Sequence, residues 1–335
     1  MSVDISVVVP VYDEAEAVAT TVRAMTAELE TSGFGSAEIV VADDGSTDGS
    51  GGAAVAAAGS VPVRVVTLGK NSGRYAARSA GLEAAAGRNI LFVDAGVTVA
   101  PGGLRFLHER LGAGDEVWNA HTTMVTEGNP YGLFWSVVST LAFGDYVRAP
   151  RTTSFGLSDF DRFPKGTTCF FAPRQLLLEG FASFRSKYAD TRRANDDTPI
   201  IRTIAARRPI NISPSFSCIY VPRNSFRAFV RHAAHRGVVF LDGHGRRESR
   251  FFPVVLAFYP ASLAAAVVAV RRPSSVVAVP AVSAAAAAAA AARVRRPAPE
   301  VRAFATLAPV YLAAHGAGMW KGLALALASR FGRPA

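Results

Sequence analysis

Two stretches of sequence decide the fold of this chain: Ile5-Ser-Val-Val-Val-Pro-Val-Tyr-Asp-Glu14 and Ile39-Val-Val-Ala-Asp-Asp-Gly-Ser-Thr-Asp48. Each begins as a short β-branched run and stops abruptly at a polar turn, which is typical of a buried parallel strand in an α/β sheet. Between them, residues 15–29 carry apolar side chains at helical spacing. The order strand, helix, strand therefore predicts an α/β sheet whose carboxyl edge, where both turns lie, binds a ligand.

Composition sets bounds on the class of protein. The chain has 335 residues, of which 50% are hydrophobic and 19% charged, and the apolar excess lies toward the carboxyl end. The formal net charge is +10, and many of the arginines fall between residues 185 and 333. This excess of basic residues is suited to binding anionic lipid headgroups or a phosphorylated substrate. Nucleic acid is the usual alternative ligand. The chain contains no nucleic-acid-binding motif, so we expect no nucleic-acid partner.

Two cysteines, Cys169 and Cys218, are too few for a disulfide framework and have no metal-ligand spacing. We expect both to be small buried residues. The amino terminus lacks a basic region followed by an apolar stretch and a cleavage site. We therefore expect no signal peptide and a catalytic half that stays in the cytosol.

The two opening turns exclude the commonest nucleotide motifs. Neither the Gly-x-Gly-x-x-Gly turn of dinucleotide enzymes nor a Walker-type loop follows the first strand. Each turn alone could belong to an unrelated α/β protein. Together, in this order, they resemble the family 2 glycosyltransferases, whose GT-A domain opens with a Pro-Val-Tyr-Asn-Glu-like turn and continues to Asp-Asp-Gly-Ser-Thr-Asp. Asp13 stands where that family more often has Asn.

The resemblance implies that a UDP- or GDP-linked sugar lies across the first two turns. It implies that the base and ribose are surrounded by Tyr12, Glu14 and Asp44, with Asp43 supporting the second turn. The first turn also includes Pro10 and Val11.

A third motif follows in Gly69-Lys-Asn-Ser-Gly-Arg-Tyr-Ala-Ala-Arg-Ser-Ala-Gly-Leu82. It resembles the family's Asn-x-Gly-x-x-x-Ala-Arg-x-x-Gly helix start, in which small residues bring a helix close to the nucleotide and an arginine approaches the phosphates. Arg74 and Arg78 are the candidates here. The alternative for each is an ordinary solvated arginine on a helix.

A further buried strand, Asn89-Ile-Leu-Phe-Val-Asp-Ala-Gly96, ends where the family carries an Asp-x-Asp metal motif. Two carboxylates there hold Mg²⁺ or Mn²⁺ against the donor diphosphate, since hard cations take oxygen ligands. In this chain Asp94 keeps the first position, but Gly96 occupies the second. The resemblance thus predicts a metal ion held by Asp94 with ligands from the diphosphate, water or elsewhere.

The paired acidic turn in Asn195-Asp-Asp-Thr-Pro-Ile-Ile-Arg202 precedes an apolar helix. It matches the family's Glu-Asp motif, whose last carboxylate acts as general base on the acceptor hydroxyl. The resemblance places that role on Asp197, with Asp196 in the position of the Glu. The alternative is that one of them only caps the helix before Pro199.

Residues 226–237 stand where many membrane-bound relatives carry a Gln-x-x-Arg-Trp-like segment, but the Gln and Trp are missing. The candidates for contacts with phosphate or acceptor are Arg231, His232, His235 and Arg236. A basic amphipathic helix lying on a membrane explains the same residues. The missing positions argue against a processive synthase.

Three apolar segments follow: residues 251–270, 276–292 and 304–328. The first is uncharged and has the roughly 20 residues of a spanning helix. The second is mostly alanine and the third contains His315 and Lys321. We expect a GT-A catalytic domain over residues 1–245 and a helical membrane region over 246–335, with the segments spanning or re-entrant.

The sequence thus predicts an inverting, metal-dependent glycosyltransferase at the inner cell membrane, with a cytoplasmic catalytic domain and a lipid-linked or saccharide acceptor in polysaccharide or cell-wall assembly. One alternative is a polyprenyl-phosphate glycosyltransferase, whose anionic acceptor needs no base. Another is a non-catalytic membrane protein with a degenerate GT-A domain. This alternative stays open because Gly96 replaces the second carboxylate of the metal motif. The sequence does not specify the donor sugar, the linkage or the oligomeric state.

Overall fold

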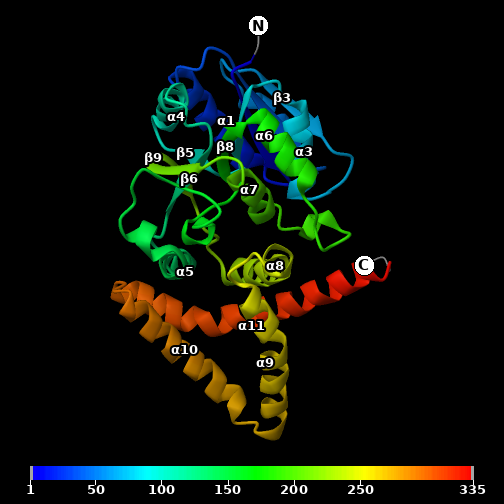
Figure 1. Cartoon of the computed structure of the whole chain (residues 1–335), viewed down its shortest axis with the longest axis vertical. Helices are drawn as coiled ribbons and strands as arrows, with labels where there is room; N and C mark the ends of the chain where they lie inside the picture. The colour runs from blue at the N-terminus through cyan, green and yellow to red at the C-terminus, as the bar shows by residue number, and fades with distance from the viewer. Residues whose placement is uncertain (1–2, 333–335) are drawn as a thin grey trace. The chain divides into compact units, whose positions relative to one another are not determined.

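The computed structural model describes residues 3–332 and divides into two compact units (Figure 1). The first comprises the chain up to Thr123 with Ala149–Arg185 and Asp196–Val221. The second comprises Met124–Arg148, Ser186–Asn195 and the chain from Pro222 onward. The chain passes between the units several times, because the segments of the second are inserted into the first.

The first unit is built on one mixed sheet. Its strands are β1 (Ile5–Val11), β2 (Ala37–Asp43), β3 (Val63–Thr67), β4 (Asn89–Val93), β5 (Thr98–Val99), β6 (Trp118–Met124), β7 (Thr153–Phe155), β8 (Cys169–Pro173) and β9 (Ile210–Tyr220). Among the described residues the strand order is β3-β2-β1-β4-β8-β6-β9-β5, with β7 also beside β9. Strands β1 to β4 run parallel, whereas β8 pairs antiparallel with β4 and β6. The carboxyl ends of β1, β2 and β4 therefore meet at one edge, as the sequence predicts.

Helices cover both faces of this sheet. They are α1 (Ala15–Glu30), α2 (Ser50–Ala56), α3 (Arg74–Ala84), α4 (Gly103–Gly112), α6 (Arg174–Ser183) and α7 (Asp197–Ala205). In β1, Val7 and Val9 belong to the core cluster shared with α1 and α4, whereas Val8 meets α3 on the other face. A Cβ at Gly81 of α3 would lie 2.4 Å from Cγ1 of Val8, so glycine is needed for this close approach. The buried run of β1 thus serves two helix layers.

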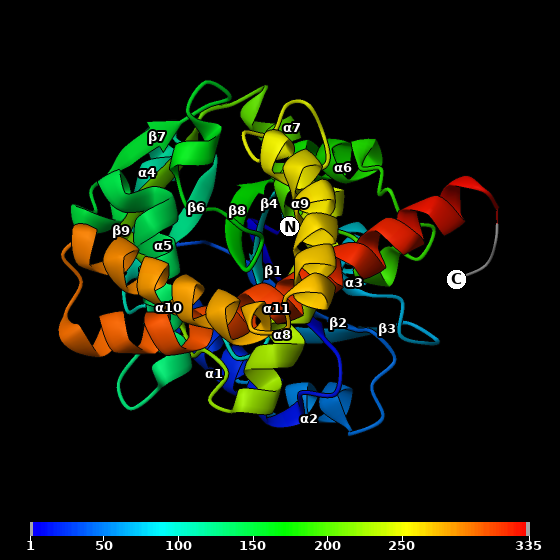
Figure 2. The same cartoon turned by 90° about the horizontal axis from the view of Figure 1, so that it is seen from below.

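The second unit is helical, with α5 (Pro130–Arg148), α8 (Phe226–His244), α9 (Phe252–Arg271), α10 (Ser275–Arg293) and α11 (Ala298–Arg330). Helix α11 packs across α8 and α5, and α10 returns beside α11 (Figure 2). The crossing of α8 and α11 depends on two glycines. A Cβ at Gly237 would lie 2.0 Å from the carbonyl oxygen of His315, and one at Gly318 would lie 2.0 Å from that of Ala234.

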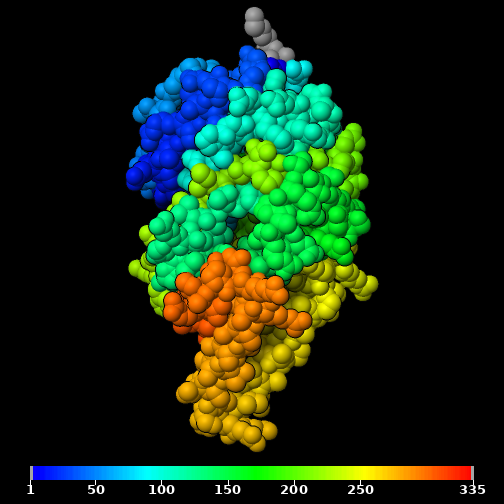
Figure 3. Space-filling model, turned by 90° about the vertical axis from the view of Figure 1, so that its left-hand side faces the viewer, coloured from blue at the N-terminus to red at the C-terminus, as the bar shows by residue number. Residues whose placement is uncertain are grey.

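Two helices among residues 3–332, α9 and α10, are long and apolar enough to cross a membrane by length and composition. Most of their surface is exposed, including Val270 and Val277 at 82% and 75%. Their yellow and orange atoms form a projection of the second unit (Figure 3). The third expected segment, residues 304–328, lies in α11 and is not among them, since polar residues such as His315 and Lys321 interrupt it. Helix α11 packs on α8.

The compact units do not follow the expected division at residue 245. Helix α8 and the inserted segments group with α9 to α11 rather than with the sheet. Because compactness alone does not define which residues carry out catalysis, the division into catalytic and membrane regions stays a prediction.

Candidate active site at the carboxyl edge of the sheet

The turns after β1 and β2 are joined to each other by hydrogen bonds. The amide of Thr47 donates to Oδ1 of Asp13 at 2.8 Å, and the amide of Ala15 donates to Oδ2 of Asp48 at 2.9 Å. Asp13 has a φ of 49°. Asn and Asp adopt this left-handed region more readily than most residues, so either suits the first turn.

The two carboxylates after β2 are buried and hold backbone. Oδ1 of Asp43 accepts a hydrogen bond from the amide of Ser46 at 2.8 Å. Asp44 uses both oxygens, which accept from the amides of Ser72 and Gly73 at 2.7 Å each. Asp43 therefore supports its own turn, as expected. Asp44 fixes the loop that leads into α3, and its predicted contact with a ribose stays a prediction.

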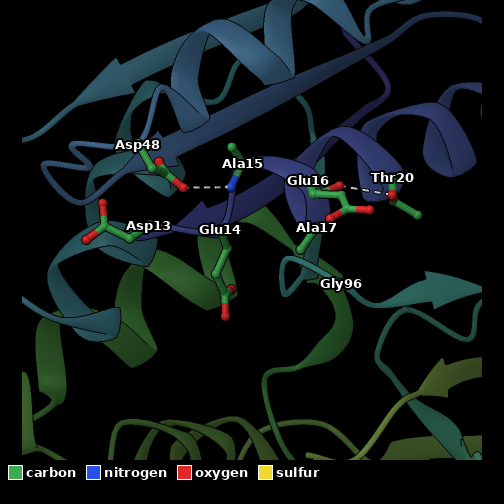
Figure 4. Close-up of a pocket in the computed structure, with 8 residues that line it drawn as sticks. All are labelled: Asp13, Glu14, Ala15, Glu16, Ala17, Thr20, Asp48 and Gly96. Atoms are coloured by element: carbon green, nitrogen blue, oxygen red, sulfur yellow. Dashed lines mark hydrogen bonds between the residues drawn. The ribbon is translucent and has the colours of Figure 1, made fainter.

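A pocket opens at the start of α1 (Figure 4). Its lining residues are Asp13, Glu14, Ala15, Glu16, Ala17, Thr20, Asp48 and Gly96. This set includes four carboxylates and no cationic side chain, so its walls repel the phosphates of a nucleotide. Beside it in sequence, Pro10 and Val11 are buried at the end of β1, whereas Tyr12 is 43% exposed and can meet a ligand.

Arg78 brings together three of the predicted site residues. Its side chain is fully buried. Nη2 lies 2.6 Å from Oδ1 of Asp94, and Nη1 lies 2.7 Å from Oδ2 of Asp196 and 3.5 Å from Oδ1 of Asp197. The alternative of a solvated helix arginine is therefore wrong for Arg78, while Arg74, one turn earlier, is exposed.

The two aspartates of the acidic turn differ in environment. Burial raises the pKa of Asp196; Arg78 opposes this shift and the charge of Asp197 reinforces it. Burial also opposes ionisation of Asp197, but Arg78, Arg74 and Thr167 outweigh it and hold the pKa of Asp197 below its ordinary value. The side chain of Asp197 is 36% exposed, against 7% for Asp196. Asp197 is thus the more accessible member of the pair and the one whose pKa is lowered.

Thr167 is a site residue that the sequence argument missed. Its hydroxyl donates to Oδ1 of Asp197. Thr167 is buried and lies two residues before the first residue of β8, Cys169. The spacing gave no signal for this contact, because the two positions are 30 residues apart.

The described residues do not by themselves fit a metal ion. No group of three or more His, Cys, Asp or Glu side chains within residues 3–332 is arranged to hold one. Oδ1 of Asp94 is bound to Arg78, and Gly96 has no side chain to offer as a ligand. A divalent cation needs more oxygen ligands than this carboxylate supplies.

The four basic candidates of the second unit lie on α8. Arg236 stacks over the ring of Trp135, with its guanidinium carbon 4.8 Å from the ring centroid, and His232 meets the same ring edge-on at 5.3 Å. Phe229 and Tyr131 belong to the aromatic cluster around them. Arg231 and His235 stand on the same helix. Their predicted role in binding phosphate or acceptor stays a prediction.

Comparisons with known proteins agree with this architecture. Residues 6–166 match the model of the family described as Glycosyl transferase family 2. The chain is 41% identical over 110 residues to the succinoglycan biosynthesis protein ExoO of Rhizobium meliloti (strain 1021), which covers 33% of this chain and 30% of that protein. The chain thus spans under a third of the length of this curated relative.

Solved structures show the same fold. TarS 1-349 of S. aureus in complex with UDP-GlcNAc superimposes with a TM-score of 0.53 at 16% identity, covering 98% of this chain and 92% of that one. The complex of the same protein with UDP gives a TM-score of 0.51 at 16% identity and the same coverage. At this identity the likeness concerns the fold alone.

The sheet, its acidic turns and the carboxylate pair at α7 define a GT-A domain, the class of fold that handles nucleotide-linked sugars. Residues 6–166, just under half of the chain, match the model of glycosyltransferase family 2. The predicted fold class is confirmed, and the match over residues 6–166 agrees with the predicted resemblance. Both cysteines are buried and unpaired, as expected.

Proposed function

We propose that this chain transfers a sugar from a nucleotide-sugar donor to a hydroxyl group of a saccharide acceptor, with inversion at the anomeric carbon. In a single displacement, the acceptor oxygen forms a bond to the anomeric carbon while the bond to the diphosphate oxygen breaks. The proton of the acceptor hydroxyl passes to a carboxylate of the protein. The nucleoside diphosphate leaves.

The observation that carries this proposal is the unequal pair at the start of α7. Asp196 is buried and paired with Arg78, so its carboxylate is engaged within the protein. Asp197 is more exposed, is held by Thr167 and keeps a low pKa. A general base must be ionised and within reach of the hydroxyl, and Asp197 meets the first condition. We assign it the role of base and Asp196 a supporting role.

On this proposal the donor nucleotide lies along the edge formed by the turns after β1 and β2. Tyr12 is exposed there and Glu14 lines the pocket at α1, so both can meet the base or ribose. Asp44 affects donor binding indirectly, because its carboxylate holds the loop that leads into α3. TarS, which has the same fold, binds UDP and UDP-GlcNAc in its complexes, and on this proposal the donor is UDP-linked.

The leaving diphosphate requires positive charge. Arg74 is exposed at the first turn of α3, where amide groups and the helix dipole also favour an anion. Arg78 stands one turn further along and is neutralised by carboxylates. Mg²⁺ or Mn²⁺ at Asp94 remains our prediction for the loaded enzyme.

The second unit supports an acceptor attached to lipid. ExoO is named as a biosynthesis protein for succinoglycan, which supports a role in polysaccharide assembly. Helix α9, with 20 residues, is long enough at about 1.5 Å per residue to cross the apolar core of a bilayer. The basic residues of α8, Arg231 and Arg236 among them, suit the phosphate of a lipid carrier.

The charges at the ends of the α9–α10 hairpin support a cytoplasmic catalytic domain. Arg247 and Arg250 precede α9, and Arg293 and Arg295 stand at the end of α10. At the tip between the two helices, the charged residues are Arg271 and Arg272. Basic residues flank both ends of the hairpin, and on this proposal the larger number of arginines at its base favours the cytoplasm for that side. A tip arginine at the bilayer centre would be costly, which favours a spanning hairpin over a re-entrant one.

The experiment that tests the proposal is a thermal-shift screen of nucleotides and sugar nucleotides on the detergent-solubilised full chain, with and without Mn²⁺. A donor stabilises only the folded state that binds it. We expect a UDP-sugar to raise the melting temperature and then to release UDP when a lipid extract is added. Binding without turnover for every donor and extract would support a degenerate, non-catalytic domain instead.

A further inference from the structure

Asp242 of α8 is a fully buried carboxylate whose two oxygens bind three groups from one short segment. Oδ1 accepts from the amide of Lys187 at 2.6 Å. Oδ2 accepts from the hydroxyl of Ser186 at 3.0 Å and from the amide of Asn195 at 2.8 Å. The first and last residues of Ser186–Asn195 therefore meet on the same carboxylate, which closes this segment into a loop at its base.

Other contacts hold the same loop on the second unit. The hydroxyl of Tyr188 donates to the carbonyl oxygen of Val238 on α8 at 2.6 Å, and the amide of Ala189 donates to Oγ of Ser329 on α11 at 2.8 Å. Gly243 lies against the side chain of Asn195, where a Cβ would come within 2.3 Å of Nδ2. The turn of α8 that carries Asp242 is thus shaped to receive the end of the loop.

The end of this loop is the beginning of the catalytic motif. Asn195 is joined by one peptide bond to Asp196, the N-cap of α7, and Asp197 is the first residue of that helix. A hydrogen bond that fixes the amide of Asn195 therefore restricts the backbone from which both aspartates project. Small displacements of a reacting group are expensive: an error of about 1 Å can reduce the rate by about 100-fold.

We propose that Asp242 is a positioning residue for the Asp196–Asp197 motif, acting through the backbone of Asn195. The proposal rests on the function proposed above, in which Asp197 is the base. It links α8, the helix that precedes the α9–α10 hairpin in sequence, to the placement of the catalytic carboxylate. Asp242 has no direct role in the chemical step.

The first test is hydrogen exchange on the full chain, which needs no substrate. Asp242→Asn replaces one acceptor oxygen by a donor, so it breaks at least one of the bonds to backbone amides. We expect faster exchange of the amides from Asn195 to the first turn of α7. The matched control is Ser329→Ala, which removes the bonds of this hydroxyl to the amide of Ala189 and the carbonyl oxygen of Leu325. It should speed exchange near Ala189 and the end of α11 and leave residues 195–200 unchanged. Unchanged exchange at residues 195–200 in Asp242→Asn would overturn the proposal.

The second test separates positioning from general stability. With the sugar nucleotide that gives the largest thermal shift, Asp242→Asn should lower kcat by about 10-fold and leave the donor KM nearly unchanged. In the background of Asp197→Asn, the same substitution should have little further effect, because the base it positions is gone. If each substitution lowers kcat by the same factor alone and in the double variant, so that the two factors multiply, Asp242 does not act through Asp197.

The failure of this inference differs from that of the proposed function. If Asp197→Asn keeps full turnover, the assignment of the base is wrong, whatever Asp242 does. If Asp197→Asn is inactive while a folded Asp242→Asn turns over normally, only the positioning role is wrong.

Discussion

Nη1 of Arg78 lies 2.7 Å from Oδ2 of Asp196, although 118 residues separate the two positions. This pair ties the start of α3, with its candidate phosphate contacts, to the start of α7, which carries the candidate base. The same guanidinium binds Asp94 at the end of β4. Three motifs that the sequence presents separately are therefore organised around one buried cation.

The charges around Arg78 explain why Asp196 and Asp197 have different environments. One guanidinium cannot neutralise three carboxylates. Asp196, the most buried of them, takes the short bond to Nη1, and Asp197 keeps a longer contact of 3.5 Å and a more exposed side chain. On the proposed function, Asp196 is the structural member of the pair and Asp197 the reactive one.

Replacing Asp197 by Asn should lower turnover by at least about 100-fold with little change in donor affinity, as expected when a positioned base is lost. Asn keeps the shape and the capacity to accept from Thr167. The measurement is steady-state release of the nucleoside diphosphate, with donor affinity from calorimetry.

Asp196→Asn is the comparison for Asp197→Asn. It should lower the melting temperature, because it leaves the buried guanidinium of Arg78 with less negative charge. If Asp196→Asn instead lowers turnover at a normal melting temperature, while Asp197→Asn is active, the roles of the two residues are exchanged.

Replacing Asp44 by Ala should destabilise the first unit, since it leaves the amides of Ser72 and Gly73 without their acceptor. We expect a loss of about 1–3 kcal/mol in the free energy of unfolding. Urea denaturation measures this loss. Donor affinity should fall as well, because the loop into α3 is released. Unaltered stability together with unaltered donor affinity would contradict the role assigned to this carboxylate.

Mn²⁺ should bind weakly to the protein alone and appreciably only with a nucleoside diphosphate, because Asp94 supplies too few ligands by itself. Calorimetric titration with Mn²⁺, in the presence and absence of UDP, checks this expectation. Tight binding of Mn²⁺ without nucleotide would show that another protein ligand completes the site.

Replacing Gly237 by Ala should weaken the crossing of α8 and α11, since the added Cβ would lie 2.0 Å from the carbonyl oxygen of His315. Overpacking of this kind lowers stability by about 1–3 kcal/mol. Gly112→Ala, at the end of α4, is the control because nothing lies within 4 Å of its Cβ position. Equal melting temperatures for the two variants in detergent would argue against this close crossing.

Replacing Ser274 by Cys should give a label on the far side of the membrane from the catalytic domain, since Ser274 stands at the tip between α9 and α10. A membrane-impermeant maleimide should react with it in intact spheroplasts. Thr306→Cys on α11 should react only after permeabilisation. The native Cys169 and Cys218 are buried, so the background is low. Labelling of Ser274→Cys only after permeabilisation would exclude a spanning hairpin in this orientation.

The sequence by itself determined the local features. The β-branched residues of Ile5–Val11 and the polar turn that follows predicted a strand buried on both faces, and with it the parallel sheet and its functional edge. The resemblance to the family 2 glycosyltransferases rested on the polar turns after these runs and the acidic turn before α7. The length of the apolar segment at α9 likewise follows from a count of residues.

Tertiary structure alone decided which of these groups meet. Three of these contacts join segments far apart in sequence. They bury Arg78 against Asp196, attach Asp44 to the loop before α3, and bind Thr167 to Asp197. Periodicity reports which side of its own element a residue occupies, but not what the neighbouring element places there. Hydrogen bonds and ion pairs act over a few ångströms, so the partners of a carboxylate are fixed only when the chain has folded.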